Sequence, residues 1–301
     1  MSTLKRVLAV WTAMLTLLFI PRPNPAAASS PTVFLNHFFV VISSESYAAM
    51  LADPYLTRTF APFEKRTTVR NDNSYTGAYW YGRTTYFEVF EPPAQGPVGA
   101  SGMALSVDGA GESAAVKAAW ATSLGAAQTS PVTRRAETAE PTWFHVTTGR
   151  DDTAFLHLWL MEYDQDFLAR WYPELTPARG MTRGEVLDRY VAKIGRLKDR
   201  EALVLGDVTS LLLALDDGDR ERLRKHAVPA GWVATPGPTA GDLNFDGPDG
   251  VRLEVMRATA TRRGVIEAQF SVQGAPKPHS STLGSVQLTV EATRARLRFA
   301  P

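Results

Sequence analysis

The sequence contains no cysteine. This absence excludes disulfide bonds, thiol chemistry and metal sites built on thiolates. Any metal ion would have to be held by histidine, carboxylate or water, and the chain offers five histidines among 301 residues. With 45% hydrophobic residues, the chain can still build one large core or two smaller ones, so its stability must come from packing.

Neither sign of charge is in excess. The chain carries 32 lysines and arginines against 31 aspartates and glutamates, which gives a formal net charge of +1. A basic excess is what attracts a protein to nucleic acid, and this balance supplies none. We therefore expect no nucleic-acid partner. The composition leaves the oligomeric state open.

The apolar run near the N-terminus is too short to cross a bilayer. Residues 7–20 form 14 uncharged positions, whereas a membrane span needs roughly 20. The run follows Lys5 and Arg6 and leads into the small residues at 25–29, an order typical of a secretory signal peptide. We predict a signal peptide over residues 1–28, cut after Ala28, and a secreted or periplasmic protein with no stable membrane anchor. Its loss removes three basic residues and no acid, so the formal charge becomes −2.

Several catalytic motifs are also missing. No phosphate loop, dinucleotide-binding fingerprint or His-Glu-x-x-His pattern occurs. The segment 99–103 lacks the second spacing of a Gly-x-Ser-x-Gly elbow, so a serine hydrolase of that kind is not supported.

The stretch 33–92 carries the most informative pattern that is present. Residues 33–42 form an apolar run typical of a buried strand, with His37 in its middle. Ser43 can cap a following helix, and two aromatic strand runs then flank a hairpin turn at Gly82. The unit predicts the order β-α-β-β-β, with His37 on the first strand and Glu88 on the last.

The same order occurs twice more along the chain. In the second copy Gly102 takes the place of His37, and His157 is aligned with Glu88. In the third copy residues 210–223 align without a gap to residues 37–50, so that Ser210 replaces the histidine. Glu254 then aligns with Glu88. Repetition of one supersecondary unit at this spacing predicts a fold built from modules.

The first copy resembles one module of the vicinal oxygen chelate superfamily, the glyoxalase and extradiol dioxygenase group. The residues that carry the resemblance are His37 in Leu-Asn-His-Phe and Glu88 in Tyr-Phe-Glu-Val-Phe. The full chain is also similar to a bacterial family of glyoxalase-like proteins without an assigned function. The resemblance implies curled mixed sheets made of paired modules, with a divalent metal held by residues on the first and last strands.

This resemblance makes His37, Glu88 and His157 the candidate metal ligands. Two imidazoles and one carboxylate suit Fe, Mn, Ni or Zn as a divalent cofactor. The replacements at Gly102 and Ser210 remove first-strand ligands, so His37 can equally be a core histidine. Two alternative ligands remain open, Glu254 from the third copy and a neighbouring strand's histidine, His145.

Aromatic residues on the same strand faces are the candidate ligand contacts. Residues of one parity on a strand share a face, which places Tyr86 and Phe90 beside Glu88, and Trp159 beside His157. A face of this composition suits a flat or apolar molecule. Ordinary core packing is the alternative interpretation of each ring.

We therefore predict an α+β protein of repeated βαβββ modules that form curled mixed sheets, with a third module at the C-terminus. The expected divisions are the signal peptide 1–28, paired modules 29–177, a connecting helix 178–204 and the third module with extra strands 205–301. Two functions are open. One is a metal-dependent lyase, isomerase or oxygenase acting on a small molecule, with its catalytic residues unassigned; the other is a non-catalytic protein that binds and sequesters such a molecule.

Overall fold

A computed structural model of the chain describes residues 31–135, 141–149, 155–171 and 180–300. The predicted signal peptide lies outside the described residues. The strands are β1 (Phe34–Val41), β2 (Phe63–Val69), β3 (Ser74–Tyr81), β4 (Tyr86–Phe90), β5 (Ser101–Ser106), β6 (Ala127–Thr133), β7 (Thr142–Gly149), β8 (Leu156–Tyr163), β9 (Leu205–Leu215), β10 (Val233–Pro236), β11 (Leu243–Asp246), β12 (Arg252–Arg257), β13 (Gly264–Val272), β14 (His279–Leu283), β15 (Val286–Val290) and β16 (Arg294–Phe299). The α-helices are α1 (Ser44–Ala52), α2 (Ser113–Leu124), α3 (Gln165–Trp171), α4 (Arg183–Lys193) and α5 (Asp217–Ala227).

The strands form two open sheets of eight. The first sheet has the order β2-β3-β4-β1-β5-β8-β7-β6, and the second has the order β10-β11-β12-β9-β13-β16-β15-β14. In each of the three predicted copies, the first and last strands are parallel neighbours joined through a helix and two further strands. The predicted α+β class of repeated βαβββ modules in mixed sheets is confirmed.

The predicted alignment of the first and third copies is confirmed by strand register. His37 pairs with Tyr86 in the first copy, and Ser210 pairs with Arg252 in the third. The helix cap at Ser43 also functions as predicted, because its side chain accepts a hydrogen bond from the Ser46 N–H. In the structure, Thr182 also closes a capping box at the start of α4.

The strands after β12 form a fourth unit that lacks a helix. Strand β13 is followed directly by β14, and β13 pairs antiparallel with β16, whereas the other three copies pair their outer strands in parallel. The physical reason is connection length. A parallel return needs a crossover of about a dozen residues, usually a helix, whereas only residues 273–278 separate β13 from β14.

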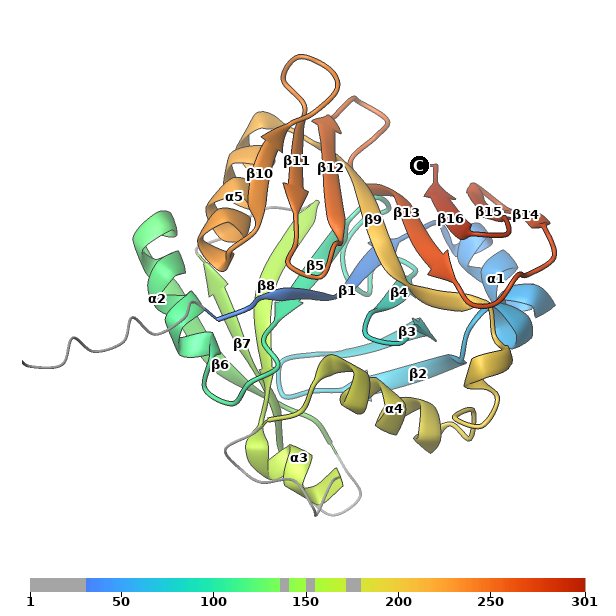
Figure 1. Cartoon of the computed structure of the whole chain (residues 1–301), viewed down its shortest axis with the longest axis horizontal. Helices are drawn as coiled ribbons and strands as arrows, with labels where there is room; N and C mark the ends of the chain where they lie inside the picture. The colour runs from blue at the N-terminus through green and yellow to red at the C-terminus, as the bar shows by residue number, and fades with distance from the viewer. Residues whose placement is uncertain (1–30, 136–140, 150–154, 172–179, 301) are drawn as a thin grey trace, which may run out of the picture.

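The main core lies between the two sheets. Apolar side chains of one strand parity from each sheet meet there, including Phe38 and Leu158 from the first sheet and Leu211 and Phe270 from the second. Figure 1 shows α2 beside α5 at one end of the molecule, α1 beside β14–β16 at the other, and α3 and α4 below the first sheet. Because the sheets pack through their apolar faces, the other face of each sheet points away from its partner.

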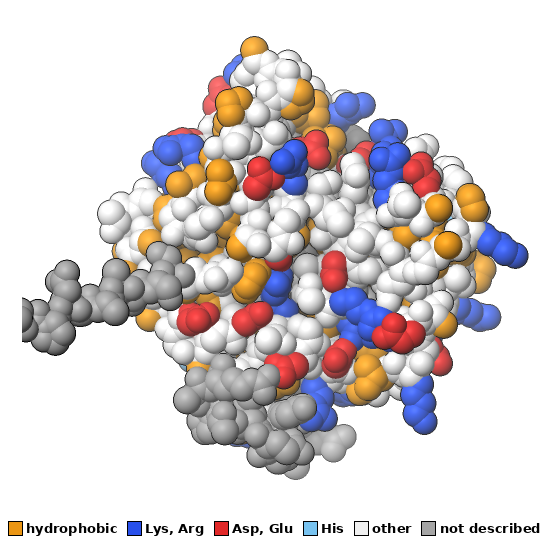
Figure 2. All heavy atoms as spheres, in the orientation of Figure 1, with side chains coloured by type: hydrophobic (Ala, Val, Ile, Leu, Met, Phe, Trp, Pro, Cys, Tyr) orange, Lys and Arg blue, Asp and Glu red, His pale blue; other side chains and the backbone are white. Residues whose placement is uncertain are grey.

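The two outer faces differ in chemistry. On the second sheet, Glu267 accepts a hydrogen bond from Arg298 at 2.8 Å and lies 3.2 Å from Arg296. On the first sheet, α4 covers one end of the face through buried aromatic contacts. Figure 2 shows acidic and basic side chains interspersed among the described residues on the face that it views. No helix within the described ranges is long and apolar enough to cross a membrane.

Candidate functional site

The outer face of the first sheet carries the predicted site residues. Strand parity separates them from the core: Phe38 and Phe87 point into the core, whereas His37, Glu88 and Trp159 line a cavity on the opposite face. The predicted assignment of these residues to one face is therefore correct.

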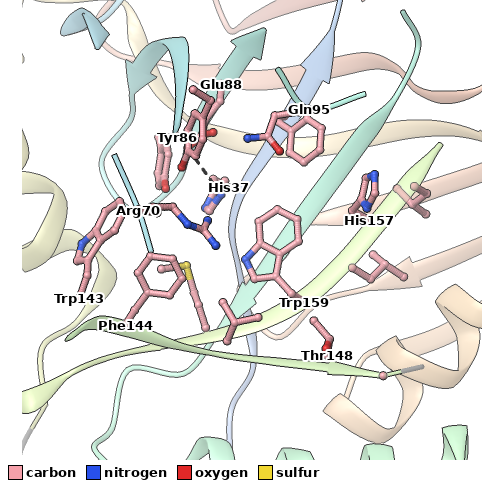
Figure 3. Close-up of a pocket in the computed structure, with 17 residues that line it drawn as sticks. His37, Arg70, Tyr86, Glu88, Gln95, Trp143, Phe144, Thr148, His157 and Trp159 are labelled. Carbon is pink, nitrogen blue, oxygen red and sulfur yellow. Dashed lines mark ion pairs between the residues drawn. The ribbon is translucent and has the colours of Figure 1, made fainter. Parts of the chain in front are cut away.

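The cavity encloses about 310 Å³, at the lower end of the range for small-molecule pockets. Figure 3 shows its polar groups set among aromatic rings. The lining residues are His37, Phe39, Arg70, Tyr75, Tyr86, Glu88, Gln95, Trp143, Phe144, Val146, Thr148, Gly149, Leu156, His157, Leu158, Trp159 and Met161.

A β-bulge fixes the orientation of His37. The pairing of β1 with β5 shifts between Leu35 and His37, so that Asn36 is the extra residue. The Asn36 amide nitrogen donates to the Ser106 hydroxyl at 3.1 Å, which leaves its oxygen to accept from His37 Nδ1 at 2.8 Å. Assigned from this network, the proton lies on Nδ1, and His37 Nε2 has a lone pair available.

His37 and Glu88 face each other at the closed end of the cavity. His37 Nε2 lies 3.8 Å from Glu88 Oε1, and both residues are buried. The His37 ring stacks on Tyr86 with centroids 4.3 Å apart, and the Trp159 ring meets it edge-on at 5.4 Å. These rings restrict the imidazole to one orientation.

Burial favours the uncharged form of both His37 and Glu88. It lowers the pKa of His37 to about 3, so the imidazole is neutral at pH 7. Burial raises the pKa of Glu88 to about 7, and this outweighs the opposing effects of Arg66, a hydrogen bond with Tyr86, and Arg70. Glu88 is therefore a carboxyl group that gains and loses a proton near neutral pH.

His157 does not converge with His37 and Glu88. Pairing across four adjacent strands places these residues in one row: Glu88, Phe39, Gly102 and His157. Three strand spacings of ~4.8 Å separate the ends of the row by about 14 Å along the sheet. The His157 ring lies against Phe39 instead, with centroids 6.0 Å apart.

The residues present do not fit a three-ligand metal centre. Ligands of one ion lie about 2.0–2.2 Å from it, and Phe39 stands between His157 and the other two predicted donors. Among the residues that the structure describes, no three His, Asp or Glu side chains form a group that could hold a metal ion.

The predicted alignment of His157 with Glu88 is wrong by two residues. His37 pairs with Tyr86, and its counterpart Gly102 pairs with His157, so the position equivalent to Glu88 holds Trp159. A shift of two keeps the strand face, which explains why His157 still lines the cavity. Above Gly102 the rings of Phe39 and Trp159 fill the space that a first-strand ligand would need. A Cβ at this glycine would lie 2.3 Å from Phe39 and 2.8 Å from Trp159.

Of the three predicted ligand contacts, Tyr86 and Trp159 line the cavity and Phe90 does not. Phe90 is fully buried behind Phe39, with ring centroids 5.7 Å apart. Its ring also fills the space over Gly77, where a Cβ would come within 2.4 Å of it. Strand alternation predicted the correct face of the sheet for Phe90. It did not show that Phe39 covers the Phe90 ring and keeps it out of the cavity.

The two alternative metal ligands lie elsewhere. Glu254 is on the outer face of the second sheet, because its neighbours Leu253 and Val255 point into the core between the sheets. His145 does not line the cavity, and its Nε2 lies 3.1 Å from Asp164 Oδ2. Neither can join His37 and Glu88.

Sequence reasoning missed Arg70, which enters the cavity from the end of β2. Strand β2 is an edge of the first sheet, and an isolated bridge joins Arg70 to Arg134 just beyond the opposite edge strand β6. The sheet curls so that its two edges approach there, and Arg135 N–H donates to Val69 at 3.0 Å. No local sequence pattern predicts a contact between Arg70 and Arg134, which are 64 residues apart in the sequence.

A family model described as a family of unknown function, DUF5829, matches residues 35–299. The chain belongs to DUF5829. The match spans both sheets, so the first and second sheets are parts of one family unit. No curated protein matches the chain.

Solved structures with a similar course of the chain include three of low sequence identity. A hypothetical protein from Staphylococcus aureus is 8% identical over 83% of this chain and 95% of its own, with a TM-score of 0.47. A Mn(II)-bound glyoxalase from Novosphingobium aromaticivorans is 8% identical over 88% of this chain and 78% of its own, with a TM-score of 0.37. A xylose isomerase-like TIM barrel/4-hydroxyphenylpyruvate dioxygenase fusion protein is 15% identical over 81% of this chain and 36% of its own, with a TM-score of 0.38. All three scores lie below 0.5, so the fold assignment rests on the strand order.

Proposed function

We propose that the chain binds a small, flat, largely apolar molecule in the cavity of the first sheet, without a metal and without chemical conversion. The observation that carries this proposal is the composition of the cavity. Six aromatic rings surround a small number of polar groups, and a ligand-binding pocket typically combines such walls with a few oriented polar contacts. The rings are Phe39, Tyr75, Tyr86, Trp143, Phe144 and Trp159.

The polar groups of the cavity determine which hydrogen-bond donors and acceptors such a ligand must carry. His37 is neutral and presents an acceptor at Nε2, so a ligand hydroxyl or amine can donate to it. Below about pH 7 Glu88 carries a proton and can donate to a ligand oxygen. Both groups lie at the buried end of the cavity, where an unpaired polar group is costly, and a ligand that pairs with them gains specificity.

The test is calorimetric titration of the folded chain with 2-naphthol, a flat neutral probe. We expect saturable binding of one probe per chain, and about tenfold weaker binding in Trp159→Leu and in Phe144→Leu, because each removes a ring from the wall. Tyr55→Leu is the matched control, because the Tyr55 ring stacks on His279 outside this cavity, with ring centroids 3.7 Å apart. Binding that is absent in the wild type, or unchanged in both cavity variants, would contradict the proposal.

The metal-dependent lyase, isomerase or oxygenase stays a second candidate because of one observation, the 3.8 Å approach of His37 Nε2 to Glu88 Oε1. These two residues would be the donors to a divalent ion, and the candidate needs a third donor that the described residues do not bring to them. Elemental analysis after loading with Fe, Mn, Ni or Zn tests it. Stoichiometric metal that is lost in folded His37→Ala and Glu88→Ala would replace the binding proposal with this one.

We also propose that the chain is exported, with residues 1–28 as a cleaved signal peptide. The proposal rests on the order of basic, apolar and small residues at the N-terminus. N-terminal sequencing of the protein recovered outside the cytoplasm should begin at Ser29. Recovery of the full-length chain from the cytoplasm would contradict it.

A further inference from the structure

Arg70 is the residue that gives the cavity a charge preference. Among the described lining residues it is the one lysine or arginine, and Glu88 is the one acid. Figure 3 shows the guanidinium of Arg70 directed into the cavity, between the side of His37 and Tyr86 and the side of Trp159.

The guanidinium is held in place from one edge. Arg70 Nε and Nη2 donate to the two carboxylate oxygens of Asp72 at 2.8 and 2.6 Å. The Arg70 side chain is 19% exposed, whereas that of Asp72 is 52% exposed and does not line the cavity. A guanidinium has five N–H donors. Asp72 takes two of them, and Arg70 is also hydrogen-bonded with the lining residue Tyr75, so the remaining donors are available on the side that faces the cavity.

An aromatic surface lies beside this charge. The guanidinium carbon of Arg70 lies 5.8 Å from the centroid of the Phe144 ring, and Trp143 lines the same side of the cavity in Figure 3. A ring compound that packs against these walls brings a substituent within reach of the guanidinium. A planar carboxylate is the substituent that matches a guanidinium edge best.

Glu88 does not oppose such an anion in slightly acidic solution. Burial raises its pKa to about 7, so near pH 6 the carboxyl is mostly protonated. The neutral His37 imidazole adds no charge of either sign. The cavity then presents Arg70 to the ligand with no full negative charge from its own lining residues.

We propose that the ligand of this cavity is an aromatic carboxylate, with Arg70 as the residue that selects it. The inference rests on the proposed binding function and adds the charge and class of the ligand. The ring lies among Phe144, Trp159 and Tyr86, and the acid group pairs with the open edge of Arg70.

The test compares three probes of one ring system by calorimetry at pH 6: 2-naphthoate, 2-naphthol and 2-naphthylmethylamine. We expect 2-naphthoate to bind at least tenfold more tightly than 2-naphthol, and the amine to bind most weakly. Arg70→Met should abolish the preference of the cavity for 2-naphthoate over 2-naphthol. Arg70→Lys should keep part of the preference, since it retains the charge without the planar fork.

Arg252→Met is the matched control, because Arg252 also pairs with an aspartate, Asp246 at 2.7 Å, but on the second sheet. Equal affinities of wild-type protein for 2-naphthoate and 2-naphthol would overturn the inference and leave the proposed binding function standing. Failure of all three probes to bind would overturn both. The wild-type series decides the question without relying on the folding of Arg70→Met.

Discussion

The residue that best reports the chemistry of the cavity is Glu88. A carboxyl group with a raised pKa in the folded state binds its proton more tightly than it does in the unfolded chain. The folded protein then holds more protons than the unfolded one between pH 4.5 and about 7, so its stability falls as the pH rises through this window.

Glu88→Gln should remove this pH dependence. Multiplying the difference between 4.5 and about 7 by ~1.4 kcal/mol per pH unit gives on the order of 3 kcal/mol. The free energy of unfolding of the variant, relative to the wild type, should therefore rise by roughly that amount between pH 4.5 and about 7. Denaturant titrations across this range measure it, with Glu254→Gln as the control for loss of a carboxylate at the equivalent strand position. A constant difference at all pH values would contradict the assignment.

His37 supplies a second prediction at this scale. Because its Nδ1 donates to Asn36 and burial disfavours its charged form, the ring should stay neutral and protonated at Nδ1 from pH 7 down to about pH 4. Nitrogen-15 NMR of the imidazole distinguishes the two tautomers and the cation. Asn36→Leu removes the acceptor and should produce a mixture of tautomers. A single Nε2-protonated form in the wild type would show that the hydrogen-bond assignment is wrong.

At the scale of elements, the glycine on β5 at the position equivalent to His37 explains the aromatic wall. Gly102 has no side chain, so the rings of Phe39 and Trp159 close over it. A first-strand ligand and this wall exclude each other sterically. The position on β5 that is equivalent to His37 is therefore a packing position.

Gly102→Ala should disturb this wall. The new methyl group meets both rings at less than 3.0 Å, so overpacking should lower the free energy of unfolding by about 1–3 kcal/mol and weaken probe binding several-fold. Gly184→Ala in α4 is the matched control, because the nearest atom to its Cβ is the Arg83 carbonyl oxygen at 3.5 Å. Alanine there should be neutral or stabilising by up to ~1 kcal/mol. Equal stability and affinity of Gly102→Ala and wild type would show that the rings do not pack over this position.

At the scale of the whole molecule, the location of the cavity follows from how the sheets pack. The two sheets join through their apolar faces, and only the first sheet has its two edges bridged, at Arg70 and Arg134, among the described strands. The second sheet instead carries ion pairs such as Glu267 with Arg298 on its outer face. The same repeated module therefore forms a cavity on the first sheet and a charged outer face on the second.

Much of this arrangement could be predicted from the sequence. The remaining parts could not be predicted, for physical reasons. Strand alternation was enough to place His37, Glu88 and Trp159 on one face, because side-chain direction in a strand is a local property. The offset of His157 depends on register between β5 and β8, and the entry of Arg70 depends on the closure of distant edges. Both are set by tertiary pairing, which a single sequence does not encode in any local pattern.

The most direct measurement is indole N–H NMR of the chain titrated with 2-naphthol. Binding in the first-sheet cavity should shift the signals of Trp143 and Trp159, which line it. It should leave three others in place, since these indoles are fully buried and donate to main-chain carbonyls away from the cavity: Trp80, Trp120 and Trp232. Shifts confined to this second group, or no shifts at saturating probe, would contradict the binding site.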